Sequence, residues 1–457
     1  LAVMTFLGAG MLSDISAQDF SLQADTLNEA RLPAQWDLQS CIDYALEQNI
    51  TIRKNRVTAE STQIDVKTAK AALFPSLSFS TSQQVVNRPY QETSSRVSGS
   101  EIISSNSKTS YNGNYGLNAS WTIYNGSKRL KTLKQERLNN QIAELDVATS
   151  ENTIKESIAQ IYIQILYAAE SVRVNENTLQ VSIAQRDRGQ ELLNAGSIAK
   201  SDLAQLEAQV STDRYQLVTA QATLQDYKLQ LKQLLELDGE NEMNVYLPKL
   251  SDENVLAPLP AKKDVYVSAL AIRPEIEASK LNVEASELGI DIAKSSYFPT
   301  ISLSAGIGTN HTSGSDFTFG EQVKNGWNNS FGLSVSVPIF NNRQTKSAVQ
   351  KAKLQRETNM LSLLDEQKAL YKTIESLWLD ANSAQQRYAA ANEKLRSTQI
   401  SYDLISEQFN LGMKNTVELL TEKNNLLQAQ QEQLQAKYMA ILNTQLLKFY
   451  QGDKLTL

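Results

Sequence analysis

The segment "FPTISLSAGIG", residues 298–308, alternates apolar and small polar side chains inside a chain that otherwise favours helix. Its apolar residues stand at every second position: Ile301, Leu303, Ala305 and Ile307. A period of two is typical of a β-strand with one apolar face. A near copy, "FPSLSFS", occupies residues 74–80. A helix-rich chain therefore carries the same strand signal twice.

The two strand motifs belong to a longer repeat. "AKAALFPSLSFS" at 69–80 matches "AKSSYFPTISLS" at 293–304, and "LNASWTIYNGSKR" at 117–129 matches "LSVSVPIFNNRQT" at 333–345. "LNAGSIAKSDLAQLEA" at 193–208 matches "FNLGMKNTVELLTEKN" at 409–424. Matches in the same order along the chain indicate an internal duplication. Each half reads short helix, helix, strand, loop, strand, very long helix, turn and long helix.

The duplication divides the chain into segments. We expect a truncated signal peptide at 1–17, a first repeat at 18–246, a linker at 247–263, a second repeat at 264–452 and a tail at 453–457. The apolar run "LAVMTFLGAGML" is too short to span a bilayer, and the small residues after it offer cleavage after Ala17. It lacks a basic start and an initial Met, hence the expectation of truncation. A cytosolic protein with a buried first helix is the alternative.

Four strands and four long helices are predicted within the repeats. Alternation places strands at about 75–86, 113–124, 299–309 and 331–341, with exposed polar loops at 87–112 and 310–330. Helices without proline are expected at about 127–194, 200–237, 343–411 and 416–450. A helix of roughly 68 residues is about 100 Å long. No compact domain of this size encloses such a rod, so the helices must reach across a distance.

The strands allow two interpretations. They could form a small sandwich with its polar face outward, or a transmembrane sheet with its apolar face toward lipid. Aromatic residues gather near the strand ends, as in the interfacial girdles of membrane barrels. At one end we expect a girdle of Phe74, Trp121, Tyr124, Tyr297, Phe298 and Phe340. At the other end stand Tyr90, Tyr111, Tyr115, Trp327 and Phe331.

A transmembrane sheet of four strands requires further chains. Unpaired strand edges cannot face hydrocarbon, and the smallest membrane barrels have about eight strands. Two chains would give a barrel of eight strands, and side chains would largely fill its interior. Three chains give twelve strands and an interior wide enough to hold water. The prediction is a mostly α-helical, internally duplicated chain that forms a trimeric 12-stranded β-barrel continuous with a long α-helical barrel.

The composition argues against several other functions. The formal net charge of −6 and pI near 5.3 make nucleic acid an unfavourable partner. The single cysteine, Cys41, excludes an intrachain disulfide and any Cys-based zinc site, and its apolar helix face predicts a buried structural thiol. The single histidine, His311, is expected to be a solvated loop residue. No catalytic motif stands out, so we expect no enzyme activity, no cofactor and no metal.

The double repeat, the paired strand starts and the two helix turns resemble the TolC-type outer-membrane efflux family, from residue 36 to residue 452. The resemblance implies a homotrimer in the outer membrane of a Gram-negative-type envelope, with a periplasmic extension. It also implies docking on a periplasmic membrane-fusion adaptor and on an inner-membrane pump of the RND or ABC type. Small molecules or proteins would leave through this duct. The sequence does not identify the cargo.

The helix turns "NAGSIAKSDL" (194–203) and "NLGMKNTVELL" (410–420) are the main candidates for function. Gly196 and Gly412 stand where a left-handed residue ends a helix, each two residues after an asparagine, Asn194 or Asn410. A simple cap is one interpretation. The resemblance implies that these turns also form the periplasmic tip, which closes the pore and docks on the adaptor.

The second turn also carries candidate gate residues. Asn415 and Glu418 fit a capping box. The resemblance implies that Glu418 contributes to an acidic ring at the pore entrance and that Lys414 holds the closed state. The family's second acid is replaced here by Thr421, which weakens any ring. In the first repeat, Lys200 and Asp202 occupy the positions equivalent to Thr416 and Glu418, where a solvated surface explains them equally well.

Two other functional classes share some of these features. A periplasmic coiled-coil scaffold or adaptor with a small β-domain would also have long helices, but its strands would need no lipid-facing side. A secreted filament subunit also combines long helices with β-regions, but it usually lacks a tandem duplication.

Overall fold

The computed structural model describes most of the chain. It covers residues 33, 35–90, 94–98, 101–105, 108–237, 243–248, 255–313, 315 and 317–456. The expected signal peptide at 1–17 and the middle of the expected linker lie outside the described residues.

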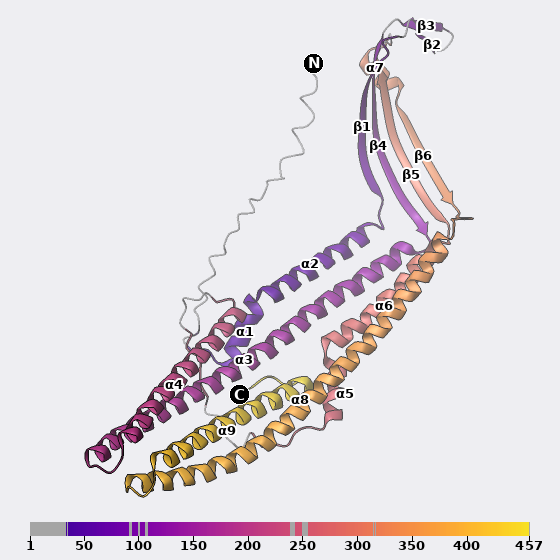
Figure 1. The fold of residues 1–457 in the computed structure, drawn as a ribbon. Helices are drawn as coiled ribbons and strands as arrows, with labels where there is room; N and C mark the ends of the chain where they lie inside the picture. The colour runs from indigo at the N-terminus through magenta and orange to yellow at the C-terminus, as the bar shows by residue number, and fades with distance from the viewer. Residues whose placement is uncertain are drawn as a thin grey trace.

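Long helices form an elongated bundle, and one sheet projects from its end (Figure 1). The first half contains α1 (Leu38–Gln48), α2 (Ile50–Ala71), β1 (Ser76–Asn87), β2 (Ser94–Ser98), β3 (Glu101–Ser105), β4 (Thr109–Asn125), α3 (Lys128–Asn194) and α4 (Lys200–Leu234). The second half contains α5 (Lys262–Ile272), α6 (Pro274–Ser295), β5 (Thr300–Thr312), α7 (Phe319–Asn325), β6 (Asn328–Ser336), α8 (Gln344–Asn410) and α9 (Thr416–Gln451). Helices α3 and α8 each have 67 residues, and α2 and α6 each have 22.

Local sequence explains where several helices begin. The side chain of Asp37 accepts a hydrogen bond from the Ser40 amide at 2.7 Å and caps α1. Pro274 occupies the first turn of α6, where its missing N–H is not needed. Helices α3 and α8 both follow a left-handed residue, Ser127 (φ 63°) or Arg343 (φ 64°). The chain therefore turns from strand to helix in the same way in both halves.

The sheet is antiparallel, in the order β1-β4-β5-β6. The two halves meet at its centre, where β4 pairs with β5 and Leu117 lies opposite Ile307. Strands β1 and β6 are the outer strands of this sheet in the described part of the chain, and each has a partner on one side only. The Trp121 indole donates to the Leu73 carbonyl at 2.9 Å and ties β4 to the end of α2.

The bounds of three strands differ from the predicted ones. Strands β4 and β5 run further from the helices than expected, beginning at Thr109 and ending at Thr312. Strand β6 ends at Ser336, so the expected strand at 331–341 was placed too late. Pro338 has no amide hydrogen to donate to a ladder, and the chain leaves the sheet before it. The expected loops at 87–112 and 310–330 also contain the β2–β3 pair and α7.

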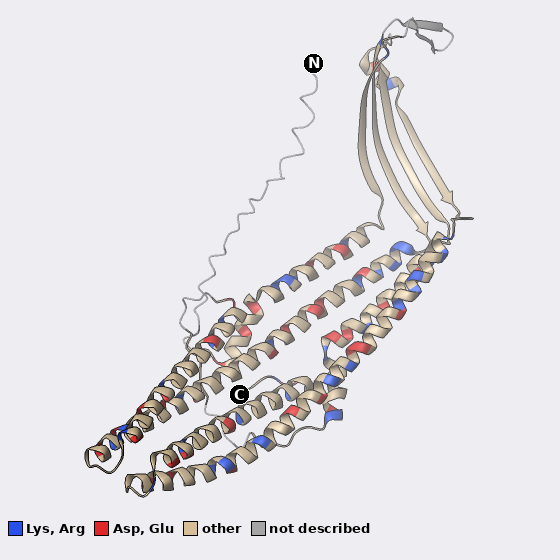
Figure 2. Ribbon diagram, in the orientation of Figure 1, with Lys and Arg blue, Asp and Glu red and all other residues tan. Residues whose placement is uncertain are grey.

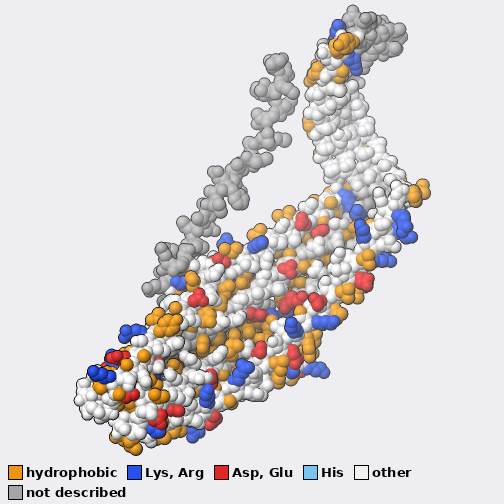
Figure 3. Space-filling view, in the orientation of Figure 1, with side chains coloured by type: hydrophobic (Ala, Val, Ile, Leu, Met, Phe, Trp, Pro, Cys, Tyr) orange, Lys and Arg blue, Asp and Glu red, His pale blue; other side chains and the backbone are white. Residues whose placement is uncertain are grey.

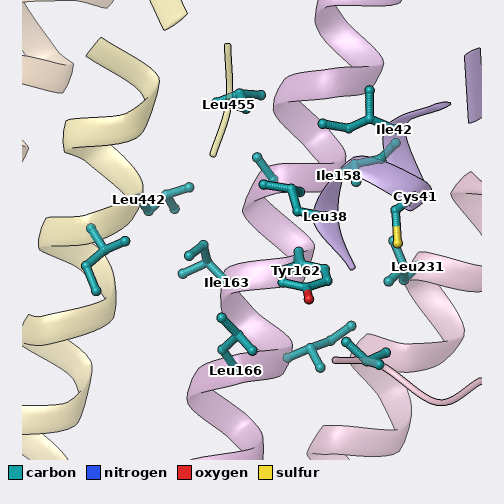
Figure 4. Close-up of a cluster of buried hydrophobic side chains, with 14 of the residues drawn as sticks. Leu38, Cys41, Ile42, Ile158, Tyr162, Ile163, Leu166, Leu231, Leu442 and Leu455 are labelled. Carbon is teal, nitrogen blue, oxygen red and sulfur yellow. The ribbon is translucent and has the colours of Figure 1, made fainter. Parts of the chain in front are cut away.

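The largest core cluster lies where α1, α3, α4 and α9 meet (Figure 4). Tyr162 is buried there and donates to the Tyr246 carbonyl at 2.6 Å. Cys41 is completely buried, and burial raises the pKa of its thiol to about 12. The prediction of a buried structural thiol is confirmed.

The prediction for His311 was wrong. His311 lies in β5, not in a solvated loop, and its ring centroid is 5.1 Å from those of both Tyr111 and Phe319. The strand continues past the Gly/Ser/Thr composition because β4 supplies a partner as far as Thr312. The opposite residue, Gly113, leaves room for the imidazole, since an added Cβ would lie 2.4 Å from it.

Candidate functional site

The two helix turns lie together at the end of the bundle furthest from the sheet (Figure 1). Arg188 of α3 donates to the Asn410 carbonyl of α8 at 3.2 Å and joins the two hairpins there. Behind the turns, side chains from α3, α4, α8 and α9 form a small apolar cluster of Leu192, Leu206, Phe409 and Leu419. We call this end, residues 185–206 and 402–423, the tip.

Gly196 and Gly412 have the left-handed conformation expected of them, with φ of +73° and +75°. The Ser197 amide bonds to the Leu192 carbonyl at 2.8 Å and the Gly196 amide to the Leu193 carbonyl at 2.9 Å, which is a Schellman motif. The second turn repeats these bonds one for one. No heavy atom beyond the adjoining residues lies within 4 Å of an added Cβ at either glycine, so both turns present open surface.

The capping box at the start of α9 is also present. The Glu418 amide donates to Asn415 Oδ1 at 2.9 Å, and Glu418 Oε2 accepts from the Asn415 amide at 3.2 Å. Lys414 Nζ lies 2.6 Å from Glu418 Oε1. The bond from Lys414, followed by that from the Asn415 amide, holds the pKa of Glu418 below its ordinary value. Lys414 and Glu418, two of the candidate gate residues, are thus bonded to each other at the start of α9.

The other predicted tip residues make local contacts. Asp202 Oδ2 accepts from the Ala199 amide at 2.9 Å and caps α4, and Lys200 is exposed beside it. Asn194 Oδ1 accepts from the Gln190 side chain at 3.0 Å. Thr421 is exposed and donates to the Val417 carbonyl at 2.7 Å. The structure therefore brings these residues to one end of the molecule but does not link them across the hairpins.

A buried charged cluster, which the sequence analysis did not single out, does link the hairpins. Lys423 of α9 forms an ion pair with Asp213 of α4 and a hydrogen bond with Ser182 of α3. The side chains of Lys423 and Asp213 are only 3% and 2% exposed. Burial lowers the pKa of Lys423, and the bond to Asp213 opposes that shift. Nearby, Gln185 donates to the Tyr402 hydroxyl at 2.8 Å.

The sequence did contain a signal for this cluster. Leu419, Lys423 and Leu426 share one face of α9, at spacings of four and three residues. On α4, Asp213 likewise continues the stripe that Leu206 and Val210 begin. A charged residue at a core position of each stripe predicts a buried pair, since unpaired buried charges are strongly unfavourable.

At the other end of the molecule, the sheet has two chemically different faces. Leu77, Phe79, Leu333 and Val335 share one face through the strand register, and each is at least 57% exposed. The opposite face carries small polar residues such as Ser78, Ser120, Ser302 and Ser334. None of β1, β4, β5 and β6 contains Asp, Glu, Lys or Arg, and Figure 2 shows them uncoloured by charge along their length.

Exposed aromatic residues mark the junction between the sheet and the helices. The six residues of the predicted girdle are 38% to 81% exposed: Phe74, Trp121, Tyr124, Tyr297, Phe298 and Phe340. Figure 3 shows apolar side chains at both ends of the sheet and charged side chains over the helices. So large an apolar surface is unusual on a protein that meets only water.

Neither a metal site nor a helical membrane span was found in the described part of the chain. Its His, Cys, Asp and Glu residues form no group of three that could hold a metal ion. Its helices contain no apolar stretch long enough to cross a bilayer.

Long helical hairpins that carry a charge-free amphipathic sheet define a mostly helical protein with the fold of bacterial outer-membrane channels. The chain is similar in fold to CusC, with a TM-score of 0.77 at 19% identity, over 91% of this chain and 92% of that one. It is also similar to the outer membrane protein VceC of Vibrio cholerae, with a TM-score of 0.75 at 16% identity, over 92% and 97% of the two chains.

The chain belongs to the outer membrane efflux protein family, whose profile matches residues 41–236 and 265–452. The resemblance inferred from the repeats is thereby confirmed, as is an outer-membrane location. This is a family of efflux proteins rather than of enzymes.

Curated relatives have low sequence identity to this chain. Efflux protein BepC of Brucella suis is 25% identical over 64% of this chain, and TolC of Escherichia coli is 25% identical over 72%. The matches span 61% and 66% of the length of these two relatives. Toxin and drug export protein A of Aggregatibacter actinomycetemcomitans is 21% identical over 88% of this chain and 83% of its own length.

Proposed function

We propose that this chain is one subunit of a trimeric outer-membrane exit duct. It would serve a tripartite efflux or type I secretion system and pass small molecules or proteins from an inner-membrane pump to the exterior. The observation that carries the proposal is the charge-free sheet, apolar on one face and small-polar on the other, joined to helices of 67 residues. A helix of that length reaches about 100 Å, a distance on the scale of a periplasm rather than of a compact domain.

The outer strands of the sheet support the trimer. Within the described residues, β1 and β6 each present an unpaired edge, and bare backbone groups cost several kcal/mol each in hydrocarbon. Pairing β1 of one subunit with β6 of the next removes every edge when the ring closes. Three subunits give twelve strands, enough to enclose water, with the serine-rich faces inward.

The matched halves support an origin by duplication. Corresponding helices have equal or nearly equal lengths, from 11 residues for α1 and α5 to 67 for α3 and α8, and α4 and α9 have 35 and 36. Each half thereby contributes one hairpin of strands to the barrel and one hairpin of helices to the periplasmic extension.

The tip is proposed as the end that meets the periplasmic adaptor and closes the pore. Its two glycine turns are open to contact from outside the subunit, as the geometry around Gly196 and Gly412 indicates. Lys414 and Glu418 would regulate the entrance, and the Lys423–Asp213 pair would hold the two hairpins together behind it. Export of toxins and drugs by a relative favours a similar range of cargo here.

The experiment is extraction and reconstitution of the mature protein. Membranes of expressing cells should release it only with detergent, as a trimer that dissociates on heating, and it should form conducting channels in planar bilayers. A periplasmic scaffold or adaptor, the competing function, would instead be released without detergent and would leave bilayers non-conducting. That result would exclude the duct.

A further inference from the structure

Helix α7 lies at the end of the sheet that is far from the helical bundle (Figure 1). Its Phe319 ring meets the His311 ring edge-on, with centroids 5.1 Å apart. The Thr309 hydroxyl donates to the Val323 carbonyl at 2.7 Å, and the Thr312 amide donates to Gln322 Oε1 at 2.8 Å. These contacts hold α7 against β5.

The strand register identifies the face on which α7 lies. Side chains alternate along a strand, so His311 and Thr309 share the face of Ile307 and Leu303. Across the ladder, Leu117 and Trp121 lie on this same face. Helix α7 therefore covers the apolar face of the sheet, not the serine-rich one.

The surface that α7 adds is aromatic. Phe317, Phe319 and Trp327 are 53%, 57% and 58% exposed. After Trp327, the alternate positions of β6 hold Asn329 and then Phe331, Leu333 and Val335 on the apolar face. The aromatic surface of α7 is thus continuous with the face that the proposed function turns toward lipid.

One basic side chain lies beside the aromatic residues of α7. Glu321 is engaged in the capping box of α7, where it accepts from the Thr318 amide at 2.8 Å. Lys324 lies in the last turn of α7 and is exposed. Exposed aromatic side chains with a lysine on the same short helix suit the boundary between acyl chains and phosphate-bearing headgroups.

We propose that α7, with Phe317, Phe319 and Trp327, is a lipid-side anchor that inserts into the headgroup boundary of the outer leaflet. The ligand is a phosphate-bearing membrane lipid, with acyl chains against the aromatic rings and phosphate near Lys324. The proposal rests on the proposed function, because the apolar face meets lipid only in a membrane-inserted sheet. The anchor fixes the depth of the far end of the sheet, as the girdle around Trp121 does at the near end.

The test is quenching of tryptophan fluorescence by brominated lipids. The protein is reconstituted in vesicles of phosphatidylcholine and phosphatidylglycerol, brominated either near the headgroup or near the chain end. Quenching is measured for the wild-type protein and for the Trp327→Phe and Trp121→Phe variants. The loss of quenching in each variant is the share due to the tryptophan that was replaced. Because both residues are exposed, neither substitution empties a core.

The proposal predicts that Trp327→Phe and Trp121→Phe each remove part of the quenching, and that the Trp327 share is about twofold larger with headgroup-proximal bromine. If only Trp121→Phe removes quenching, while aqueous acrylamide reaches Trp327, α7 faces water or the pore. The anchor is then refuted while the membrane sheet stands. If Trp121→Phe removes none, the membrane-inserted sheet is refuted, and with it the placement of α7.

Discussion

At the scale of single residues, the buried Lys423–Asp213 pair is the least ordinary feature of the helical bundle. Long charged side chains are almost never fully buried unless paired, and this pair also includes Ser182. Gln209 donates to the second Asp213 oxygen, Oδ1, at 2.9 Å. The two charges thus have partners from three helices, which belong to both halves of the chain. The buried pair thereby specifies how the two helical hairpins pack.

Removing one partner of this pair should be strongly destabilising. We expect Lys423→Met to lower the free energy of unfolding by about 3–5 kcal/mol, because Asp213 is left charged and buried. Lys423→Met combined with Asp213→Leu should recover part of that loss, since no unpaired charge remains. Denaturant unfolding of the reconstituted protein measures both.

The matched control is the exposed Lys394–Glu432 pair, which joins α8 and α9 at 2.8 Å with side chains 43% and 42% exposed. Lys394→Met should change stability by less than about 1 kcal/mol. Equal losses of unfolding free energy from the two lysine substitutions would contradict the conclusion that the buried Lys423–Asp213 pair stabilises the packing of the hairpins.

The capping box of α9 should depend on pH. The pKa of Glu418 is lowered by Lys414 and by the Asn415 amide, so the folded turn favours the carboxylate. The stabilising contribution of Glu418 is fully present above the ordinary glutamate pKa of about 4.3. It is lost as the pH falls through the lower pKa that Glu418 has in the folded protein. Hydrogen exchange of the amides in the first turn of α9, corrected for its intrinsic pH dependence, measures this effect. The protection of these amides should decrease as the pH falls through the pKa of Glu418 in the folded protein.

Glu418→Gln should abolish this dependence, because the amide does not titrate. Protection that falls equally in acid for the variant and the wild-type protein would show that Glu418 does not control the turn.

At the scale of elements, the helix turns depend on two glycines. A side chain at Gly412 meets no neighbour but must adopt a φ of +75°, so Gly412→Leu should cost about 1–2 kcal/mol locally. We further expect Gly196→Leu and Gly412→Leu to abolish export while trimers still assemble, because the added side chain projects from the open surface of the tip. Drug accumulation in cells measures export, and trimer bands from their membranes measure assembly.

Gly320 in α7 is the control for an added side chain without backbone strain. An added Cβ there also meets no atom within 4 Å, but no left-handed φ is required. Gly320→Leu should be tolerated in export. Normal export by both tip variants would instead show that the turns are not a docking surface.

How far the sequence predicts the elements depends on the signals near each boundary. Helix α3 ends at Asn194 and α8 at Asn410, within one residue of expectation, because Gly196 and Gly412 terminate them. Helix α7 was missed because seven residues give too little periodicity. The spacing of Thr318 and Glu321 nevertheless fits a capping box and could have indicated the start of this helix. The end of β6 was misplaced because apolar residues continue past Ser336, although Pro338 cannot join a ladder.

The candidate site was predictable only in part. Turn glycines and the Asn415–Glu418 box follow from local chemistry, since all their bonds lie within a few residues. The core stripes of α4 and α9 indicate that Asp213 and Lys423 are buried and paired, but the cluster joins residues up to 241 positions apart, and no local pattern specifies which residues pair. His311 was misjudged for the same reason, because its aromatic contacts come from β4 and α7.

At the scale of the whole molecule, the described part of the chain leaves one edge of β1 and one edge of β6 unpaired. Its main core is confined to the middle of the bundle, where α1, α3, α4 and α9 meet, while the sheet exposes large apolar side chains such as Phe79 and Leu333. Under the proposed function, other copies pair the outer strands and lipid covers the apolar face. Assembly of the sheet from several chains is therefore the central claim of this account.

Disulfide trapping between β1 and β6 of neighbouring subunits tests that claim most directly. One cysteine replaces Ser78 or Ser80 of β1 and a second replaces Ser330 or Ser334 of β6, all on the polar face of the sheet, in a Cys41→Ala background. Mild oxidation of membranes should give a ladder that ends at a covalent trimer, whereas single-cysteine controls should give at most dimers. If every pairing left the protein monomeric, or if the ladder ended at a dimer, a barrel closed by three chains would be contradicted.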